Sequence, residues 1–307
     1  MNRQLHHLRC LAAALALMGA LHAQGANVCG HSDSPVNPQA AAPGIGGTGD
    51  VALKPGIGGT GIDNGGIGGT GIVGVITGFA SICVNGVEVH YDESMPVNDN
   101  GQTVKTGVLA LGQVVVVKAK GQGDELQAEK IALQHLVVGP VERVNTARSE
   151  VRVLGQTLRW SGEPGTLSAL KPGQWVRVSG LRMSDGSIDT THLQPIPPQA
   201  QAQLTGPAEH GAEGTLRIGE TTVQTGRLGF LEGLRAWRAA LNGQEVRVQG
   251  NWDGRQLVAT GMQLQPTRTT MGPVGRVVVE GYVKTASTDG LDIGQGRMAL
   301  GAQVNAR

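Results

Sequence analysis

The sequence predicts an all-β protein made of several small modules in tandem, each an OB-like β-barrel or a β-sandwich. Three observations favour this class. Glycine accounts for 49 of 307 residues and aromatic residues for only 3%, a composition typical of short aliphatic strands joined by glycine turns. A strand-like pattern recurs at spacings of 61 and 70 residues. The chain also exceeds the length that one hydrophobic core supports, so two to four compact units are expected.

The first 23 residues are typical of a secretory signal peptide. Arg3 and Arg9 supply a positive region, residues 11–21 are apolar, and residues 21–23 form a suitable cleavage site. Cleavage removes two arginines and no acidic residue, so the formal charge of +1 becomes −1. This charge gives no indication of nucleic-acid binding. We expect a periplasmic or secreted protein with no transmembrane segment in the mature chain, because no later stretch reaches a membrane-spanning length.

Cleavage also leaves two cysteines, Cys29 and Cys83, since Cys10 lies in the signal. In an oxidising compartment these two predict a disulfide. The alternative is two free thiols. A bridge that closes a loop of about 54 residues would stabilise the fold by about 4 kcal/mol in the chain-entropy model.

Residues 24–72 form a Gly-rich low-complexity segment. The hexapeptide GIGGTG occurs in it three times, at residues 44–49, 56–61 and 66–71. Each copy matches the formula of a dinucleotide-binding loop, but that loop lies between a strand and a helix, and neither is predicted here. We interpret the segment as a flexible or extended linker. If Cys29 pairs with Cys83, all three copies lie inside the closed loop, and we expect the segment to lie along the first β module.

Three segments of the form G-Q-x-V-x-V mark the β modules. They occupy residues 112–117, 173–178 and 243–248, and each precedes a Gly-containing turn and a second short strand. This arrangement predicts a hairpin that closes each module. The predicted units are β module 1 at residues 73–136, β module 2 at 137–200, β module 3 at 201–266, and a partial β module 4 at 267–307. We expect the partial module to pack on module 3 or to complete a shared sheet.

One helix is predicted, in module 3. Phe230, Leu234, Trp237 and Leu241 recur at helical spacing on one stripe, and Asn242-Gly243 provides a stop signal. The resulting order of three strands, a helix and two strands is that of an OB-type barrel. The equivalent stretches of modules 1 and 2, residues 92–108 and 162–170, are predicted to be loops.

These features together resemble a family of secreted bacterial proteins that carry the domain of unknown function 5666 (DUF5666). The resemblance rests on the GIGGTG copies, the segment ITGFASICVNG at residues 76–86, and the Gly-Gln hairpins. It implies an exported, β-rich envelope protein. It brings no reaction, cofactor or catalytic residue.

Few residues are candidates for a ligand site. Period two places His90 and Asp92 on one strand face, where they could share a cation, although two ligands do not make a site and a solvated strand end is the alternative. Trp175 and Arg177 share the outer face of another strand. They offer a stacking pair for a glycan or oligonucleotide, or they cover a contact between modules. We predict no catalytic residue, no metal and no cofactor.

The strand at residues 114–117 is apolar on both faces and therefore needs a cover on its outer side. The candidates are the Gly-rich segment, a neighbouring module and a partner protein, in that order.

The predicted function is a non-enzymatic envelope protein whose modules provide a binding or scaffolding surface. The partner is unknown; another envelope protein or a glycan fits, and no nucleic acid is expected. One alternative is a hydrolase acting on an envelope polymer, which needs carboxylates gathered in one cleft. The other is an OB-type single-strand nucleic-acid binder, which needs basic residues along the Trp175 face.

Overall fold

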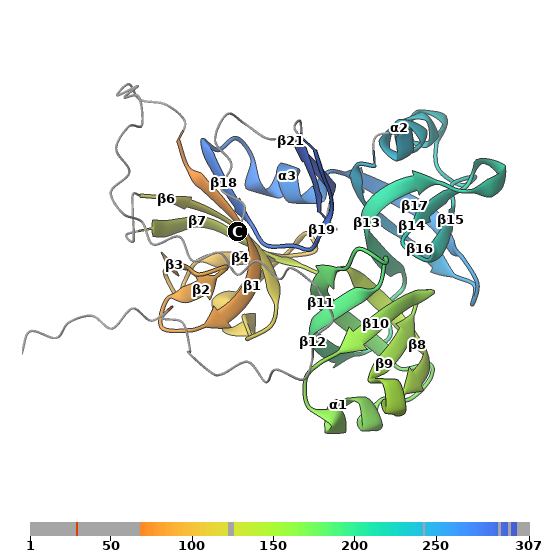
Figure 1. The fold of residues 1–307 in the computed structure, drawn as a ribbon, viewed down its shortest axis with the longest axis horizontal. Coiled ribbons are helices and arrows are strands. Elements are labelled where there is room, and N and C mark those ends of the chain that lie inside the picture. Colours follow the sequence, from red (N-terminus) through yellow and green to blue (C-terminus); the bar gives the residue numbers. More distant parts are fainter. Residues whose placement is uncertain are drawn as a thin grey trace, which may run out of the picture.

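The computed structural model describes Cys29 and residues 68–121, 126–241, 243–287, 290–293 and 296–299. This part of the chain folds into three five-stranded β-barrels followed by a C-terminal segment (Figure 1). The predicted signal peptide and the first two GIGGTG copies lie outside the described residues. None of the described helices has both the length and the hydrophobicity that crossing a bilayer requires.

Barrel 1 is closed because its strand pairing returns to its starting strand. β1 pairs with β2, β2 with β3, β3 with β7, β7 with β6, and β6 with β1. The β3–β7 contact is parallel and so needs a crossover connection. Residues 92–108, predicted as a loop, supply this crossover and contain a hairpin and a 3-10 helix. The elements are β1 (Thr70–Gly78), β2 (Ile82–Val84), β3 (Val87–His90), β4 (Pro96–Asp99), β5 (Gln102–Lys105), η1 (Thr106–Val108), β6 (Val114–Lys120) and β7 (Leu126–Gln134).

Barrel 2 closes in the same order, from β8 through β9, β10, β12 and β11 back to β8. Its crossover holds the short helix α1, in a stretch predicted as a loop. Pro164 starts this helix at a position where its missing N–H costs no hydrogen bond. The elements are β8 (Val137–Asn145), η2 (Thr146–Arg148), β9 (Glu150–Val153), β10 (Gln156–Trp160), α1 (Pro164–Ala169), β11 (Trp175–Arg182) and β12 (Ile188–Ile196).

Barrel 3 repeats this pairing, from β13 through β14, β15, β17 and β16 back to β13. The predicted helix is present in its crossover as α2. β13 also pairs with β8, so barrels 2 and 3 share one sheet and one hydrophobic core. The elements are β13 (Ala202–His210), η3 (Ala212–Gly214), β14 (Leu216–Ile218), β15 (Thr221–Gln224), α2 (Phe230–Leu241), β16 (Glu245–Trp252) and β17 (Leu257–Leu264).

The Gly-Gln pairs are the turns that precede the fourth strand of each barrel. Their glycines have left-handed backbone angles, which glycine adopts without strain. The Gln113 and Gln174 side chains each accept a hydrogen bond from a backbone N–H three residues earlier, which closes the turn. Alternate valines after each turn are fully buried in the barrel interior: Val115, Val117, Val176, Val178, Val246 and Val248.

The outer side of β6 is covered by the C-terminal segment and by barrel 2. Val116 packs against Met271 of α3 (Pro266–Met271), and Val114 packs against Leu181 of barrel 2 and Tyr282. All three covering residues lie in neighbouring predicted modules, the second candidate: Leu181 in module 2, and Met271 and Tyr282 in the partial module 4. Most of the Gly-rich segment, which was ranked first, lies outside the described residues. Since both valines are buried, this strand gives no support for a partner protein.

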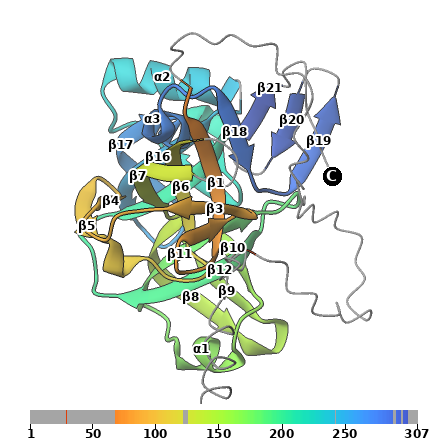
Figure 2. The same ribbon diagram turned by 90° about the vertical axis from the view of Figure 1, so that its left-hand side faces the viewer.

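The C-terminal segment joins barrel 1 more closely than barrel 3. β18 (Arg276–Val279) pairs in parallel with β1, beside which it lies in Figure 2. It therefore extends the sheet of barrel 1. Of the two expectations, packing on module 3 or completing a shared sheet, the second is closer to this result. A separate three-stranded sheet follows, made of β19 (Val283–Ser287), β20 (Gly290–Ile293) and β21 (Gly296–Ala299).

The end of the third GIGGTG copy is part of a strand and not of a linker. Thr70 and Gly71 begin β1 and pair on both sides, with β6 and with β18. A Cβ atom on Gly71 would lie 2.1 Å from Met271 Sδ. The glycine is therefore needed for α3 to approach the sheet.

Replacing Gly71 with Ala is expected to lower the free energy of unfolding by about 2 kcal/mol, because the new methyl group displaces the buried Met271 side chain. Gly107→Ala is the matched control, since nothing lies within 4 Å of a Cβ there. Urea denaturation measures both variants. Equal losses in the two would contradict the close-approach explanation.

Candidate functional site at the junction of the three barrels

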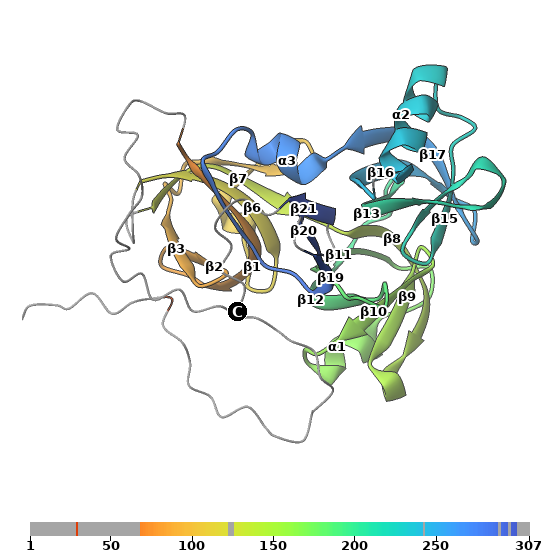
Figure 3. The ribbon, with the colours of Figure 1, turned by 45° about the horizontal axis from the view of Figure 1, so that its top comes forward.

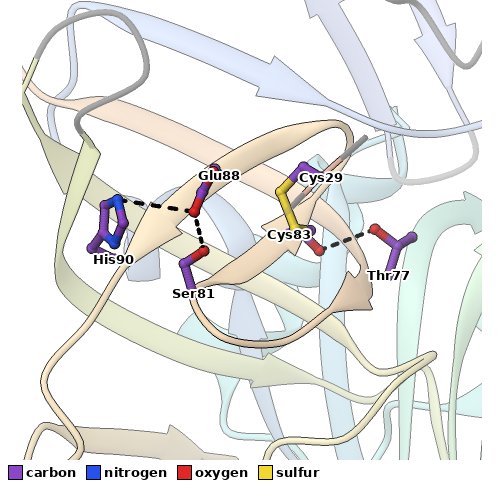
Figure 4. The surroundings of a disulfide bond; sticks show 6 residues. All are labelled: Cys29, Thr77, Ser81, Cys83, Glu88 and His90. Atoms are coloured by element: carbon purple, nitrogen blue, oxygen red, sulfur yellow. Dashed lines mark hydrogen bonds and ion pairs between the residues drawn. A yellow bond between two sulfur atoms is a disulfide. The ribbon is translucent and has the colours of Figure 1, made fainter. Parts of the chain in front are cut away.

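The predicted disulfide is present between Cys29 and Cys83, with Cα atoms 5.4 Å apart (Figure 4). Cys83 lies on β2 and is almost fully buried. The Thr77 hydroxyl donates to the Cys83 carbonyl oxygen at 3.3 Å. The bridge therefore attaches Cys29 to the wall of barrel 1.

His90 and Asp92 are exposed and have different partners. The Nε2 atom of His90 lies 4.0 Å from Glu88 Oε1 (Figure 4). Asp92 accepts hydrogen bonds from the backbone N–H and the hydroxyl of Ser94, at 2.7 and 2.6 Å, and these bonds lower the pKa of its carboxyl. Within the described ranges, no group of three or more His, Cys, Asp or Glu side chains could hold a metal ion.

Trp175 and Arg177 lie on the outer face of β11, opposite the buried Val176 and Val178, as the alternation indicates. Trp175 packs against the core that barrels 2 and 3 share. Arg177 Nη1 lies 2.8 Å from Asp99 Oδ2 of barrel 1. Arg177 thus takes part in an ion pair between barrels.

This ion pair belongs to a cluster of buried and partly buried polar side chains where the three barrels meet. We call it the barrel junction; it consists of Asp99, Gln134, His135, Arg177, Ser179, Glu245 and Thr267. Barrel 1 contributes Asp99 at the end of β4 and Gln134 at the end of β7. His135 lies in the short link that follows β7 and leads to barrel 2. Barrel 2 contributes β11, barrel 3 contributes the start of β16, and α3 contributes its first turn.

A first chain of contacts runs through His135, which is 1% exposed. His135 Nε2 lies 3.0 Å from Asp99 Oδ1. Burial lowers the pKa of His135, and the hydrogen bond with Asp99 opposes this only in part. Burial alone would raise the pKa of Asp99, but the contacts with His135 and Arg177 outweigh it and lower the pKa. At neutral pH the junction therefore holds a neutral imidazole that donates from Nε2 to an ionised carboxylate.

Ser179 extends this chain into the order Ser-His-Asp, which is also the order of a hydrolase triad. Its hydroxyl, however, donates to the Gln134 carbonyl oxygen at 3.0 Å, while His135 Nδ1 lies at 3.3 Å. The Ser179 residue is 0% exposed. A nucleophile must reach a substrate atom, and this hydroxyl is sealed between barrels. The arrangement holds strands together and does not present a reactive group.

A second chain of contacts joins barrel 1 to barrel 3 through Glu245. Gln134 Nε2 donates to Glu245 Oε1 at 2.9 Å. Thr267 donates its backbone N–H and its hydroxyl to the same carboxylate, at 3.0 and 2.8 Å. Burial raises the pKa of Glu245, although the hydrogen bonds from Thr267 and Gln134 oppose the rise. A hollow lined in part by Gln134, Arg247 and Thr267 is too small for more than a water molecule.

Arg182 provides a further buried contact, between barrels 2 and 3. Its guanidinium donates to Gln156 Oε1 at 2.6 Å and to the Gly186 carbonyl at 2.8 Å within barrel 2, and to the Thr205 carbonyl oxygen of barrel 3 at 3.4 Å. A Cβ on Gly219 would lie 2.4 Å from its Nη1 atom, so glycine leaves room for the guanidinium. Burial lowers the pKa of Arg182 to about 10, and the group remains charged at neutral pH.

Comparison with known families gives two matches along the chain, at residues 70–132 and 138–193. The first covers barrel 1 from β1 to β7, and the second covers barrel 2 from β8 to β12. The chain carries the domain of unknown function DUF5666. Each DUF5666 match coincides with one closed barrel, and barrel 3 lies beyond the matched residues. No curated protein and no solved structure matches the chain.

The two DUF5666 barrels supply only part of the junction. Asp99, Arg177 and Ser179 lie within the matched residues, whereas Gln134 and His135 lie in the link between the two matches. Sequence reasoning singled out Arg177 but missed His135, Asp99 and Glu245. His135 is a lone histidine between two apolar strands, and Asp99 falls in a stretch predicted as a loop. The one signal in the sequence is that His135 is a lone histidine next to the predicted boundary between modules 1 and 2.

The stability of the protein is expected to fall more steeply with acid in the wild type than in His135→Gln. Because the folded pKa of His135 lies below its ordinary value of about 6.5, the unfolded chain binds more protons in that range, and stability falls as the pH drops from 7 towards 5. Glu245 acts in the opposite sense, since stability from a raised pKa is lost as the pH rises. Both proteins keep Glu245. The difference between their free energies of unfolding, measured by urea denaturation at each pH, therefore excludes the contribution of Glu245. If the wild type and His135→Gln lost equal stability between pH 7 and pH 5, the assignment of His135 as a neutral, buried imidazole would be contradicted.

Proposed function

We propose that the protein is an exported, non-enzymatic scaffold of the bacterial cell envelope, in which three barrels are held in one fixed arrangement to present a binding surface. The observation that carries the proposal is the barrel junction. Its side chains form hydrogen bonds across module boundaries, from Gln134 to Glu245 and from Arg177 to Asp99. Two of its atoms, Gln134 Oε1 and Arg177 Nε, are left without a hydrogen-bond partner among the described residues. Buried hydrogen-bonded networks of this kind are costly to leave half-satisfied and therefore favour a single arrangement.

Export is supported by the signal-like residues 1–23 and by the disulfide, since disulfides persist in oxidising compartments. A fusion of residues 1–30 to an alkaline phosphatase that is active only outside the cytoplasm tests it. Phosphatase activity in intact cells is expected. Its absence would overturn the envelope location.

The scaffold itself is tested by small-angle X-ray scattering of the oxidised protein. We expect a scattering curve that fits one fixed arrangement of the barrels. A curve that fits only a mixture of arrangements would overturn the proposal, because a scaffold that does not hold its parts presents no defined surface.

The hydrolase alternative requires carboxylates open to a polymer. Asp99 and Glu245 both lie in the barrel junction, but each is buried and bonded to side chains of the chain itself. Incubation of the purified protein with peptidoglycan sacculi distinguishes the two functions. Release of soluble fragments that Asp99→Asn abolishes would establish the hydrolase and overturn the scaffold.

A further inference from the structure

Helix α2 packs against the barrels with a face of small residues and leaves a face of large apolar residues exposed. Ala236, Ala239 and Ala240 are buried in the core shared by barrels 2 and 3, where their small side chains let the helix approach the sheet. The other face, which carries most of the stripe that predicts the helix, points to solvent. Its exposed side chains are Phe230 at 86%, Leu231 at 65%, Leu234 at 45% and Trp237 at 51%.

We call these four exposed side chains of α2 the apolar patch. The patch is unusual because four large apolar side chains lie close together on one surface. Single exposed apolar side chains are ordinary, but these four fall within one helix of 12 residues. Trp237 is held in place by a tilted ring contact with His210 of β13, with centroids 5.5 Å apart. The patch is therefore part of the ordered surface of barrel 3.

Basic side chains border the patch. Arg227 precedes the helix, and Arg235 and Arg238 lie on it; all three are exposed. At 100° per residue, Arg235 and Arg238 fall beside Leu231 at the edge of the apolar stripe. Glu232 is the one acidic residue of the helix. The chain as a whole is close to neutral, so the positive charge at this helix is local.

The helix lies at the periphery of the molecule. Figures 1, 2 and 3 all place α2 at the outer edge of barrel 3, away from barrel 2 and its helix α1. A flat surface can therefore meet this helix face. A stable protein interface normally buries about 1,200 Å² or more in total, which is more than one short helix face supplies. A lipid surface needs no such matching partner.

We propose that this face of α2 docks the protein onto the surface of an anionic lipid bilayer. Phe, Leu and Trp side chains enter the boundary between headgroups and acyl chains, and the bordering arginines pair with lipid phosphates, as in interfacial amphipathic helices. The inference rests on the proposed function, because a scaffold of the envelope has a bilayer within reach. It names the surface to which that scaffold binds.

The test is co-sedimentation of the chain from Gln24 onward with vesicles. This chain lacks the apolar residues 11–21, and it keeps both disulfide cysteines and every described element. The vesicles contain phosphatidylcholine alone, or phosphatidylcholine mixed with phosphatidylglycerol. We expect binding to the mixed vesicles. Phe230→Ser should weaken it about tenfold or more, and Arg235→Gln about fivefold.

Matched controls make the comparison specific to this face. Leu111→Ser removes an apolar side chain that is 57% exposed on barrel 1, and Lys105→Gln removes an exposed charge there. Both should leave vesicle binding unchanged. Phe230→Ser should also keep the melting temperature of the parent chain, because Phe230 is exposed.

Binding that Phe230→Ser leaves unchanged, or no binding to either vesicle, would overturn the inference. Equal binding to neutral and mixed vesicles would overturn the assignment to anionic lipid. Dimerisation in analytical ultracentrifugation that Phe230→Ser abolishes would assign the face to a second copy of the chain instead. None of these results bears on the scattering and sacculus experiments, so the docking inference and the scaffold proposal can fail separately.

Discussion

Replacing Cys29 with Ser is expected to lower the free energy of unfolding by about 4 kcal/mol. The disulfide closes a loop of 54 residues, and a cross-link of this length removes conformational freedom mainly from the unfolded chain. Cys29 is the better position to change. It is partly exposed, whereas a Ser hydroxyl at the buried Cys83 would add a desolvation cost of its own. Urea denaturation of the oxidised proteins measures the difference.

Reduction provides the control for this prediction. Dithiothreitol should lower the urea midpoint of the wild type to that of Cys29→Ser and should leave the variant unaffected. A wild type whose midpoint does not move on reduction would contradict a stabilising role for the bridge.

Replacing Asp99 with Ala is expected to cost about 3 kcal/mol. Removing one partner of a buried ion pair leaves the other charge without compensation, which typically costs 3–5 kcal/mol. The lower end applies because the Arg177 side chain is 28% exposed and water can partly solvate it. His135 also loses its acceptor. Since the substitution removes contacts between barrels 1 and 2, we expect unfolding to separate into two transitions.

Glu129→Ala is the matched control for Asp99→Ala. Glu129 pairs with Lys118 at 3.6 Å on the surface of the same barrel, and exposed pairs contribute at most about 1 kcal/mol. Differential scanning calorimetry distinguishes the variants. A single transition in Asp99→Ala, with a loss no larger than that of Glu129→Ala, would refute the role assigned to the junction.

Local patterns account for the parts of the fold that were predicted correctly. The Gly-Gln turns depend on a left-handed glycine and on a side-chain hydrogen bond to a residue three positions away, so they can be read from adjacent residues. The valine alternation after them reports one buried face for the same reason. The hairpin within residues 92–108 was missed because its strands β4 and β5 are only four residues each, and only Val97 among the β4 residues is apolar and buried.

The candidate site was largely beyond such reasoning. Asp99, His135 and Ser179 are separated by 36 and 44 residues, and no local period relates them. Trp175 and Arg177 were correctly placed on the outer face of their strand, but the partner of Arg177 depends on how barrel 1 packs against barrel 2. That packing is decided by contacts between side chains on different modules.

The sequence by itself determined the β-rich class, the positions of the Gly-Gln turns and the helix, and the pairing of the two cysteines outside the predicted signal. These features depend on neighbouring residues or, for the disulfide, on there being one available pair. Only the tertiary structure decided what covers β6, how the junction is assembled, and which face of α2 is buried. Helical spacing marks Phe230, Leu234 and Trp237 as one stripe, yet the alanines on the other side fit closer to the sheet. The close approach of helix and barrel therefore left the larger side chains in solvent.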